Sequence, residues 1–549
     1  MQNSKSNLNV ITRRSFFDRS LKAGAAVAMG TLMDIPLVMK QALAEGSIGL
    51  NGKKVLFIWL RGANDGLNSL IPIQDGAYAL NRPTIAIPKD VGTDYATPGA
   101  ADFPLAGSAG FTYGSYPFAI RTGNRFAALH PSLKFLAPVY NAGQLGVVHR
   151  VAYPRQSRSH FDSQRYWENG LPNNNLNSEG IFYRAMLEHL IDRGALANPL
   201  TGVSIQSSLP LILRGSDAPM TNLTDPLRYD LLGIPNSTTG NTKATNFLNT
   251  ANSYPFPSKK NRGLLDLQYQ NMSKTLNIFA GIDFTESGNT FRDDEVTDGD
   301  QEWYDGNGSQ GYYLFPTNSE KNGGWRRPGA GGAAVFNKYA VPTGLHGFFN
   351  QLKSAAIVLN KTPAIIAGTE LGGFDTHNMQ GGIDGDHSNL NRGIGWAMYA
   401  LRKYFSRYAD QATWQNIVVV TLTEFGRTTI ENTTLGTDHA EAGVMLAAGG
   451  AIKGYNAGLA RSGVFNCSPS DPIPWVDGGS GSMFGVNGRY LRRTTDYRQV
   501  LGEIIRKHLG STQNQLNRII PGYADPLERL LAGGSSTDGT QIRAELGLL

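Results

Sequence analysis

Short runs of consecutive apolar residues recur along the chain. The clearest are Lys54–Leu60, 145–151, 364–368, Ile417–Leu422 and 444–448. Continuous apolar runs of this length are typical of strands buried on both faces of a parallel sheet. The segments between several of them carry apolar residues at helical spacing, which predicts helices over 131–142, 178–193, 345–359, 389–408 and 495–509. This alternation predicts an α/β fold with a mostly parallel central sheet flanked by helices.

The stretch from about 215 to 340 breaks the pattern. It is polar and rich in glycine, asparagine and serine, with one helical patch near 264–279, and residues 293–332 show little apolar periodicity. We interpret it as an irregular insertion or cap on the core. Residues 45–549 are thus expected to form one α/β domain carrying this insertion.

The first 44 residues have the pattern of an export signal. Arg13 and Arg14 stand ahead of a modest apolar run at 23–32, and Ala42-Leu43-Ala44 offers small residues for cleavage. Paired arginines in this setting are typical of twin-arginine signals, so we expect the twin-arginine translocase as a partner and a periplasmic or secreted location. The apolar run is shorter than the roughly 20 residues that span a bilayer. No segment after residue 44 predicts an integral membrane helix.

Charge and cysteine content exclude several classes of function. The net charge is +6, but residues 1–44 account for +4 of it, so the rest of the chain gives no argument for nucleic acid binding. The single cysteine, Cys467, cannot form an intramolecular disulfide or hold an iron–sulfur cluster alone. No glycine-rich dinucleotide fingerprint stands at a strand–helix junction, so a redox cofactor is not indicated.

Residues able to bind a metal follow the ends of successive predicted strands or lead into one. They are Asp65, Ser159-His160, Asp375 with His377, Glu424, and Asp438-His439. In a parallel sheet these loops emerge on one side, so the side chains can converge. Carboxylates and imidazoles suit zinc, manganese and similar divalent ions, whereas magnesium and calcium prefer oxygen. We therefore expect one or more divalent metal ions, with zinc, manganese, magnesium and calcium left undistinguished.

Hydroxyl and guanidinium groups lie next to these residues. Ser159, or alternatively Ser157, stands ahead of a helix, where a hydroxyl acts either as an N-cap or as a nucleophile assisted by a metal and the positive helix end. Arg158 and Arg427 offer planar forks that match phosphate or sulfate, the alternative being solvated or salt-bridged arginines.

Together these motifs resemble the DUF1501 family, a broad bacterial family of mostly uncharacterised exported proteins. Besides the twin-arginine leader, they are LRGANDGLN at 60–68, RSHFD at 158–162, GFDTH at 373–377, EFGR at 424–427 and GTDH at 436–439. The family is similar to the alkaline phosphatase/sulfatase superfamily. The resemblance implies an alkaline phosphatase-like sheet with one or two metals at the strand ends.

The resemblance also implies roles for particular residues. Asp65 looks like a metal-bridging aspartate, and Asp375, His377 and His439 look like the ligands of one ion. Glu424 stands where relatives usually carry an Asp-His pair, and Ser159 resembles the nucleophile. No Cys-x-Pro-x-Arg sequence occurs, which argues against a formylglycine sulfatase.

Two hypotheses of function follow. The first is an exported metal-dependent hydrolase of phosphate or sulfate esters that uses a serine nucleophile, with Ser159, Arg158 and Arg427 in the catalytic site. The alternative is a non-catalytic surface protein of the same fold that contains a structural metal and binds polysaccharide. The sugar rings of the polysaccharide would stack on aromatic side chains of the insertion, namely Trp303, Tyr304, Tyr312, Tyr313 and Trp325.

Overall fold

The computed structural model describes most of the chain outside the N-terminus and the insertion. The described residues are 46–49, 51–101, 117–190, 200–215, 220–225, 246, 250, 275, 278–279, 281–284, 292–293, 312–318, 326–328, 334–336, 341–476, 489–536 and 539–549. The expected signal at 1–44 and most of the expected insertion lie outside them, including Trp303, Tyr304 and Trp325. Among the described residues, no helix has the length and apolarity needed to cross a membrane.

A nine-stranded sheet forms the centre of the fold, with strand order β17-β5-β14-β13-β1-β12-β6-β7 and with β18 also pairing with β5. The strands are β1 (Lys54–Leu60), β5 (Leu145–Ala152), β6 (Gly202–Ile205), β7 (Thr221–Leu223), β12 (Ile366–Leu371), β13 (Ile417–Leu422), β14 (Gly443–Ala448), β17 (Val464–Phe465) and β18 (Thr495–Asp496). All neighbouring pairs are parallel except the two that involve β14. The prediction of an α/β fold with a mostly parallel sheet is confirmed.

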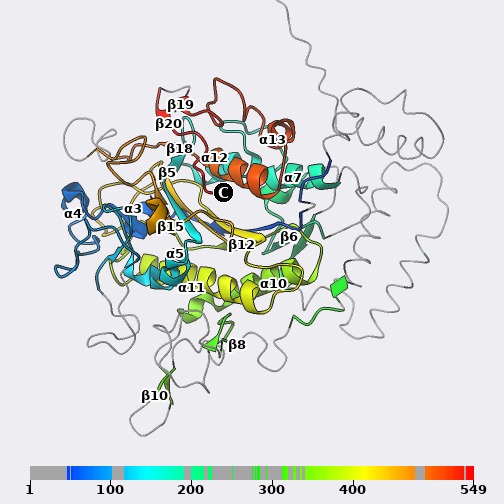
Figure 1. Ribbon diagram of the computed structural model, residues 1–549, viewed down its shortest axis with the longest axis horizontal. Coiled ribbons are helices and arrows are strands. Elements are labelled where there is room, and N and C mark those ends of the chain that lie inside the picture. The colour runs from blue at the N-terminus through cyan, green and yellow to red at the C-terminus, as the bar shows by residue number, and fades with distance from the viewer. Residues whose placement is uncertain are drawn as a thin grey trace, which may run out of the picture.

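Helices cover both faces of this sheet (Figure 1). One face packs on α5 (Ala137–Asn141), α10 (His346–Lys361) and α11 (Asp386–Arg407), and the other on α6 (His160–Asn169), α7 (Ile181–Leu190), α12 (Tyr497–Glu503) and α13 (Gln513–Ile519). The strand β1 shows why: Leu56 and Ile58 belong to one core cluster, and Phe57 and Trp59 belong to the other. Successive side chains of a strand point to opposite faces, so a fully apolar strand supplies two cores.

Two predicted helices differ in detail. Residues 131–142 form a 3-10 helix, Pro131–Leu136, followed by α5, because Pro138 at the start of α5 has no N–H to continue the earlier hydrogen-bond ladder. Residues 495–509 begin with β18. The helix α12 starts after Asp496, whose side chain forms a capping box with Gln499, and it continues as a π-helical turn, Ile504–His508.

The remaining elements are short. They are α3 (Gly66–Ser69), β2 (Leu70–Ile71), α4 (Gly76–Asn81), β3 (Ile120–Arg121), β4 (Ala128–Leu129), β8 (Arg292–Asp293), β9 (Tyr312–Tyr313), β10 (Arg326–Pro328), β11 (Ala334–Phe336), β15 (Tyr455–Asn456), β16 (Arg461–Ser462), β19 (Gly534–Ser535), β20 (Gln541–Ile542), and 3-10 helices at Leu211–Leu213, Thr343–Leu345 and Ala457–Leu459.

The direction of β14 determines which loops meet. The strand β1 is parallel to its neighbours β12 and β13, and β5 runs in the same direction because β14, between β5 and β13, is antiparallel to both. The carboxyl ends of these four strands therefore lie at one edge of the sheet. Because β14 runs opposite to β5 and β13, the residues that precede Gly443 lie at that same edge. The loop holding Asp438 and His439 thus joins the loops that follow β5, β12 and β13.

Candidate metal centre

Three imidazoles and one carboxylate meet at this edge of the sheet. They come from His160 at the start of α6, Asp375 and His377 after β12, and His439 before β14. The Nε2 atom of His439 lies 3.0 Å from Nε2 of His160 and 2.9 Å from Nε2 of His377. One carboxylate oxygen of Asp375, Oδ1, lies 3.4, 3.1 and 3.2 Å from Nε2 of His160, His377 and His439, respectively.

The other ring nitrogen of each histidine is held by an acceptor. Nδ1 of His160 lies 2.8 Å from a carboxylate oxygen of Glu424, Nδ1 of His439 lies 2.8 Å from the carbonyl oxygen of Arg158, and Nδ1 of His377 lies 3.2 Å from Oδ1 of Asp438. Carbonyl and carboxylate oxygens only accept, so each Nδ1 carries the proton and donates it. In the neutral form of each ring, Nε2 then presents a lone pair to the centre.

Lone pairs and a carboxylate oxygen at these separations repel one another unless a proton or a metal ion lies between them. A zinc ion bound tetrahedrally at 2.0–2.1 Å places its ligand atoms about 3.3 Å apart, close to the contacts of 2.9–3.4 Å found here. Histidine ligands that donate Nδ1–H to a carboxylate or carbonyl are the usual outer arrangement of metal sites. His160, Asp375 and His439 therefore fit a divalent ion, and His377 lies beside this group, against His439 and Asp375.

The local field shifts the pKa values of His160, Asp375 and His439. The hydrogen bond to Glu424 raises the pKa of His160, whereas partial burial and the Arg427 charge lower the pKa of His439. Burial alone would raise the pKa of Asp375, but the hydrogen bond and charge of Arg427 outweigh it and hold that pKa at about 2. Asp375 is thus a permanent anion at neutral pH, as a metal ligand must be.

Arg427 is fully engaged by the protein. Its three guanidinium nitrogens donate to Asp375 and to the carbonyl oxygens of Gly62, Ala63, Phe374 and Thr437, and the side chain has no exposed surface. A guanidinium buried in this way is not presented to a substrate. The structure instead gives Arg427 the role of fixing Asp375 and of tying the loop after β1 to the loop after β12.

Two further predicted site residues lie directly behind the histidines. The Oε1 atom of Glu424, which is buried, accepts from His160, from the Gly62 N–H at 2.9 Å and from Gln164 at 3.0 Å. Burial would raise the pKa of Glu424, but these donors outweigh it and lower the pKa. Asp438 holds His377 through one oxygen and is bonded by Arg489 at 2.6 Å through the other. Both carboxylates orient ligands.

Asp65 lies outside the cluster of ligand atoms. Its carboxylate is fully buried and forms two hydrogen bonds of 2.6 and 3.0 Å with Arg82, while Gln380 donates to it at 2.6 Å. The oxygen of the Gln380 amide accepts from Thr376 and Thr437, which adjoin the ligand residues. Asp65 therefore anchors the two ligand loops from below through Gln380.

Glycine allows these loops to approach so closely. A Cβ atom on Gly62, whose φ is +107°, would lie 2.4 Å from the backbone nitrogen of Asp375, and one on Gly436 would lie 2.4 Å from the backbone of His377. Real Cβ atoms do not approach a backbone so closely, and the φ of Gly62 disfavours other residues. The two glycines of the RGANDG and GTDH motifs thus serve loop packing around the centre.

The predicted hydroxyls belong to the chain segment that leads into His160. The Oγ atom of Ser159 caps α6 by accepting from the Asp162 N–H at 3.4 Å, and Oγ of Ser157 accepts from the Ser159 N–H at 3.2 Å. The Arg158 guanidinium is exposed, lies 4.5 Å from the centroid of the Tyr490 ring and donates to its hydroxyl. The chain thus places two hydroxyls and one accessible guanidinium within a few residues of His160.

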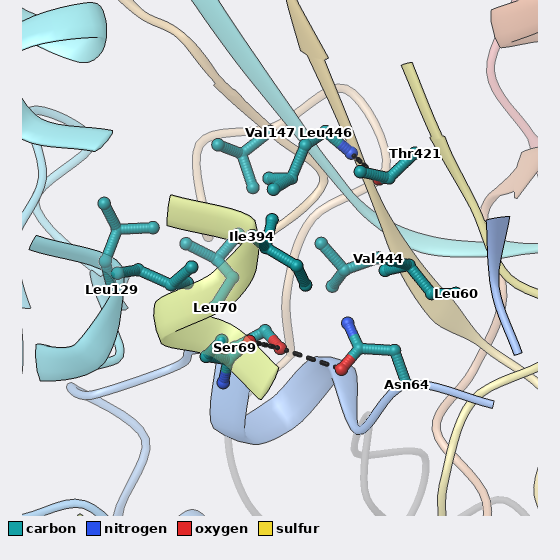
Figure 2. Close-up of a pocket in the computed structure, with 12 residues that line it drawn as sticks. Leu60, Asn64, Ser69, Leu70, Leu129, Val147, Ile394, Thr421, Val444 and Leu446 are labelled. Atoms are coloured by element: carbon teal, nitrogen blue, oxygen red, sulfur yellow. Dashed lines mark hydrogen bonds between the residues drawn. The ribbon is translucent and has the colours of Figure 1, made fainter. Parts of the chain in front are cut away.

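A cavity that the structure shows elsewhere does not belong to this centre. Figure 2 shows its lining, which is mainly aliphatic, with Leu60, Leu70, Val147 and Ile394 around it and the hydroxyl of Ser69 bonded to Asn64. No ligand atom of the centre lines it. We assign it to the packing of β13, β14 and α11.

Residues 360–458 match a family model described as "Protein of unknown function (DUF1501)". The match supports the DUF1501 family. It includes Asp375, His377, Glu424, Arg427 and the Asp438-His439 pair, whereas His160 lies outside the matched residues. Neither curated proteins nor solved structures give a match to this chain.

The sequence pattern left Gln380 and Arg489 without a role and named His160 only as part of a pair with Ser159. His160 was expected as a possible metal-binding residue within the Ser159-His160 pair, and its imidazole is one of three ligand-type groups that lie together. Gln380 and Arg489 hold ligand loops through side-chain contacts that no motif indicates. The available signal for His160 was its position just after a predicted strand, the same position that Asp375 and Glu424 occupy.

Proposed function

We propose that this protein is a divalent-metal-dependent hydrolase of phosphate or sulfate esters. The observation that carries the proposal is the convergence of Nε2 of His160, His377 and His439 with Oδ1 of Asp375, each imidazole fixed from behind by an acceptor. Two imidazoles in a set of three, with the His377 imidazole beside them, favour zinc, manganese or a similar ion over magnesium or calcium.

Solvent access to the centre supports a catalytic metal. The side chains of His160, His377, His439 and Asp375 are 23, 43, 27 and 48% exposed, so a substrate can reach them directly. A divalent ion held there would polarise an ester oxygen and lower the pKa of a hydroxyl beside it. A structural metal site, by contrast, is usually closed by its ligands.

In this mechanism each residue near the centre has a separate role. Ser159, at the positive end of α6, supplies the oxygen that bonds to phosphorus or sulfur as the bond to the alcohol oxygen breaks, and the alcohol leaves with a proton. Water then cleaves the serine ester and restores the hydroxyl. Arg158 binds the nonbridging oxygens. Arg427, Glu424 and Asp438 hold the ligands in place, and Ser157 is the alternative nucleophile.

The resemblance of the motifs to the DUF1501 family supports the finer parts of the proposal. We propose that the fold is alkaline phosphatase-like, that residues 45–549 form one domain with an insertion, and that the protein is exported by the twin-arginine route to the periplasm or beyond. This route carries folded proteins, which suits a chain with one cysteine.

The test combines metal analysis with turnover of aryl phosphate and aryl sulfate esters. We expect the wild type to hold a stoichiometric divalent ion, His439→Ala to lose it, and Ser159→Ala to keep it while losing at least about a thousandfold in turnover. His346→Ala, on α10, is the control for loss of a histidine outside the centre. Unchanged turnover in both Ser159→Ala and Ser157→Ala would contradict the serine mechanism. Bound metal without any ester turnover would favour the polysaccharide-binding alternative.

A further inference from the structure

Two large apolar side chains are exposed next to ligand residues of the centre. Phe161 directly follows His160 and is 89% exposed, and Met379 lies two residues after His377 and is 62% exposed. Among the described residues, the strongly exposed large apolar side chains include a single phenylalanine and a single methionine, and these are the two. Because His160 and His377 both contact His439, their neighbours lie on separate chain segments at the rim of one centre.

The backbone of Met379 is held in an unfavourable conformation. Its φ is +47°, in the left-handed region that residues other than glycine rarely adopt. Its N–H donates to the carbonyl oxygen of Thr434 at 2.9 Å, and the following Gln380 N–H donates to Leu435, so the loop is fixed there. Backbone strain of this kind concentrates at functional sites. The strained residue presents its flexible thioether side chain to solvent beside the metal ligands.

The rim combines this apolar surface with positive charge. The exposed guanidinium of Arg158 lies two positions before His160, and Phe161 lies one position after it. An aromatic ring also packs against the ligand histidines. The centroid of the Phe425 ring lies 4.8 Å from that of His160 and 4.9 Å from that of His439. A ligand that joins an anionic group to an apolar group would match both parts of this surface.

We infer that the substrate carries an aryl or long alkyl group next to its anionic ester, and that Phe161 and Met379 contact this group. The inference rests on the proposed hydrolase function and adds the class of substrate. Exposed phenylalanine and methionine gain from covering apolar surface, and methionine adapts its shape to different partners. The open centre, with ligands 23–48% exposed, leaves room for a bulky group.

The test compares hexyl phosphate with ethyl phosphate on the metal-loaded full chain, and the matching sulfates in the same way. The two alcohols are nearly equal leaving groups, so a difference in kcat/KM reports contact with the longer chain. We expect the wild type to prefer the hexyl ester about tenfold, as partial burial of the extra methylene groups predicts. Phe161→Ala and Met379→Ala should each reduce the preference several-fold. Leu527→Ala, which removes another exposed apolar side chain, should retain it.

Inhibition by hexylphosphonate and ethylphosphonate gives a second readout, and bound cobalt, monitored by its visible spectrum, confirms that the variants keep the centre. Equal kcat/KM for the two esters in the wild type, or an unchanged preference in Phe161→Ala and Met379→Ala, would overturn the inference and leave the hydrolase proposal intact. If no ester is cleaved and neither phosphonate changes the cobalt spectrum, the hydrolase proposal is wrong, and so is the inference that rests on it.

Discussion

Replacing Glu424 by glutamine tests whether the carboxylate behind His160 maintains the centre. The three donors around this side chain, from His160, Gly62 and Gln164, all point to Oε1, and Oε2 is buried with no hydrogen-bond partner among the described residues. A glutamine must therefore put its carbonyl oxygen at Oε1 and its NH₂ group at the unpaired position. The change converts charge-assisted hydrogen bonds into neutral ones and buries two unpaired N–H groups.

The size of both effects follows from these contacts. A hydrogen bond to a charged group contributes about 1 kcal/mol more than a neutral one, so weaker support of His160 should lower metal affinity roughly 5- to 10-fold. The buried amide should lower the free energy of unfolding by about 1–3 kcal/mol. Both are measurable on one preparation, by zinc competition against a chromophoric chelator and by urea unfolding of the metal-free protein.

Glu168→Gln provides the matched control. Glu168 is also a buried carboxylate near this edge of the sheet, where it pairs with Arg61 at 3.0 Å and accepts from the Leu211 N–H at 3.1 Å, but it contacts no ligand of the centre. Its substitution should reduce stability and leave zinc affinity within about twofold. Zinc affinity that is unchanged in Glu424→Gln, or equally reduced in Glu168→Gln, would refute the role assigned to Glu424.

Three further predictions concern pH and the buried charges. Metal affinity should decline as the pH is lowered, beginning above pH 6.5, because the raised pKa of His160 lets protons compete with the metal for Nε2. A metal affinity that stays constant down to about pH 5.5, measured by chelator competition, would contradict this. Asp65→Asn should lower the free energy of unfolding by about 3 kcal/mol because it leaves the buried Arg82 charge uncompensated, and a loss under about 1 kcal/mol in urea unfolding would argue against it. Burial lowers the pKa of His130 and His149 to about 3, so the unfolded chain takes up protons first below pH 6.5. Each histidine should then cost up to about 1.4 kcal/mol of stability per pH unit, measurable by urea unfolding at several pH values, and an unchanged midpoint between pH 7 and 5 would count against it.

Sequence patterns located the sheet because its strands are apolar on both faces. The bounds of β1 and β13 follow directly from continuous runs of mostly aliphatic and aromatic residues. The same reasoning predicted that residues after these strands would share one edge, and the structure does bring Asp375, His377 and His439 together there. The antiparallel direction of β14 could not be read from its apolar run, since such a run fixes burial and not direction.

The division between ligands and their supports was not readable from spacing. Asp438 and His439 are adjacent, yet His439 contacts Asp375, whereas Asp438 contacts Nδ1 of His377 and Arg489. Asp65 follows a strand just as Asp375 follows β12, but the packing of α4 places Arg82 against it, which makes it a buried anchor. These outcomes depend on contacts between distant segments, and one-dimensional patterns do not record such contacts.

The four ligand-type groups are contributed by three separate segments, and 279 positions separate His160 from His439. The centre thus exists only after β5, β12 and β14 have all taken their places in the sheet. A chain arrested part-way through folding presents an incomplete set of donors and would hold the proposed ion weakly. If the proposed ion binds, its occupancy would distinguish completely folded molecules from incompletely folded ones, independently of catalysis.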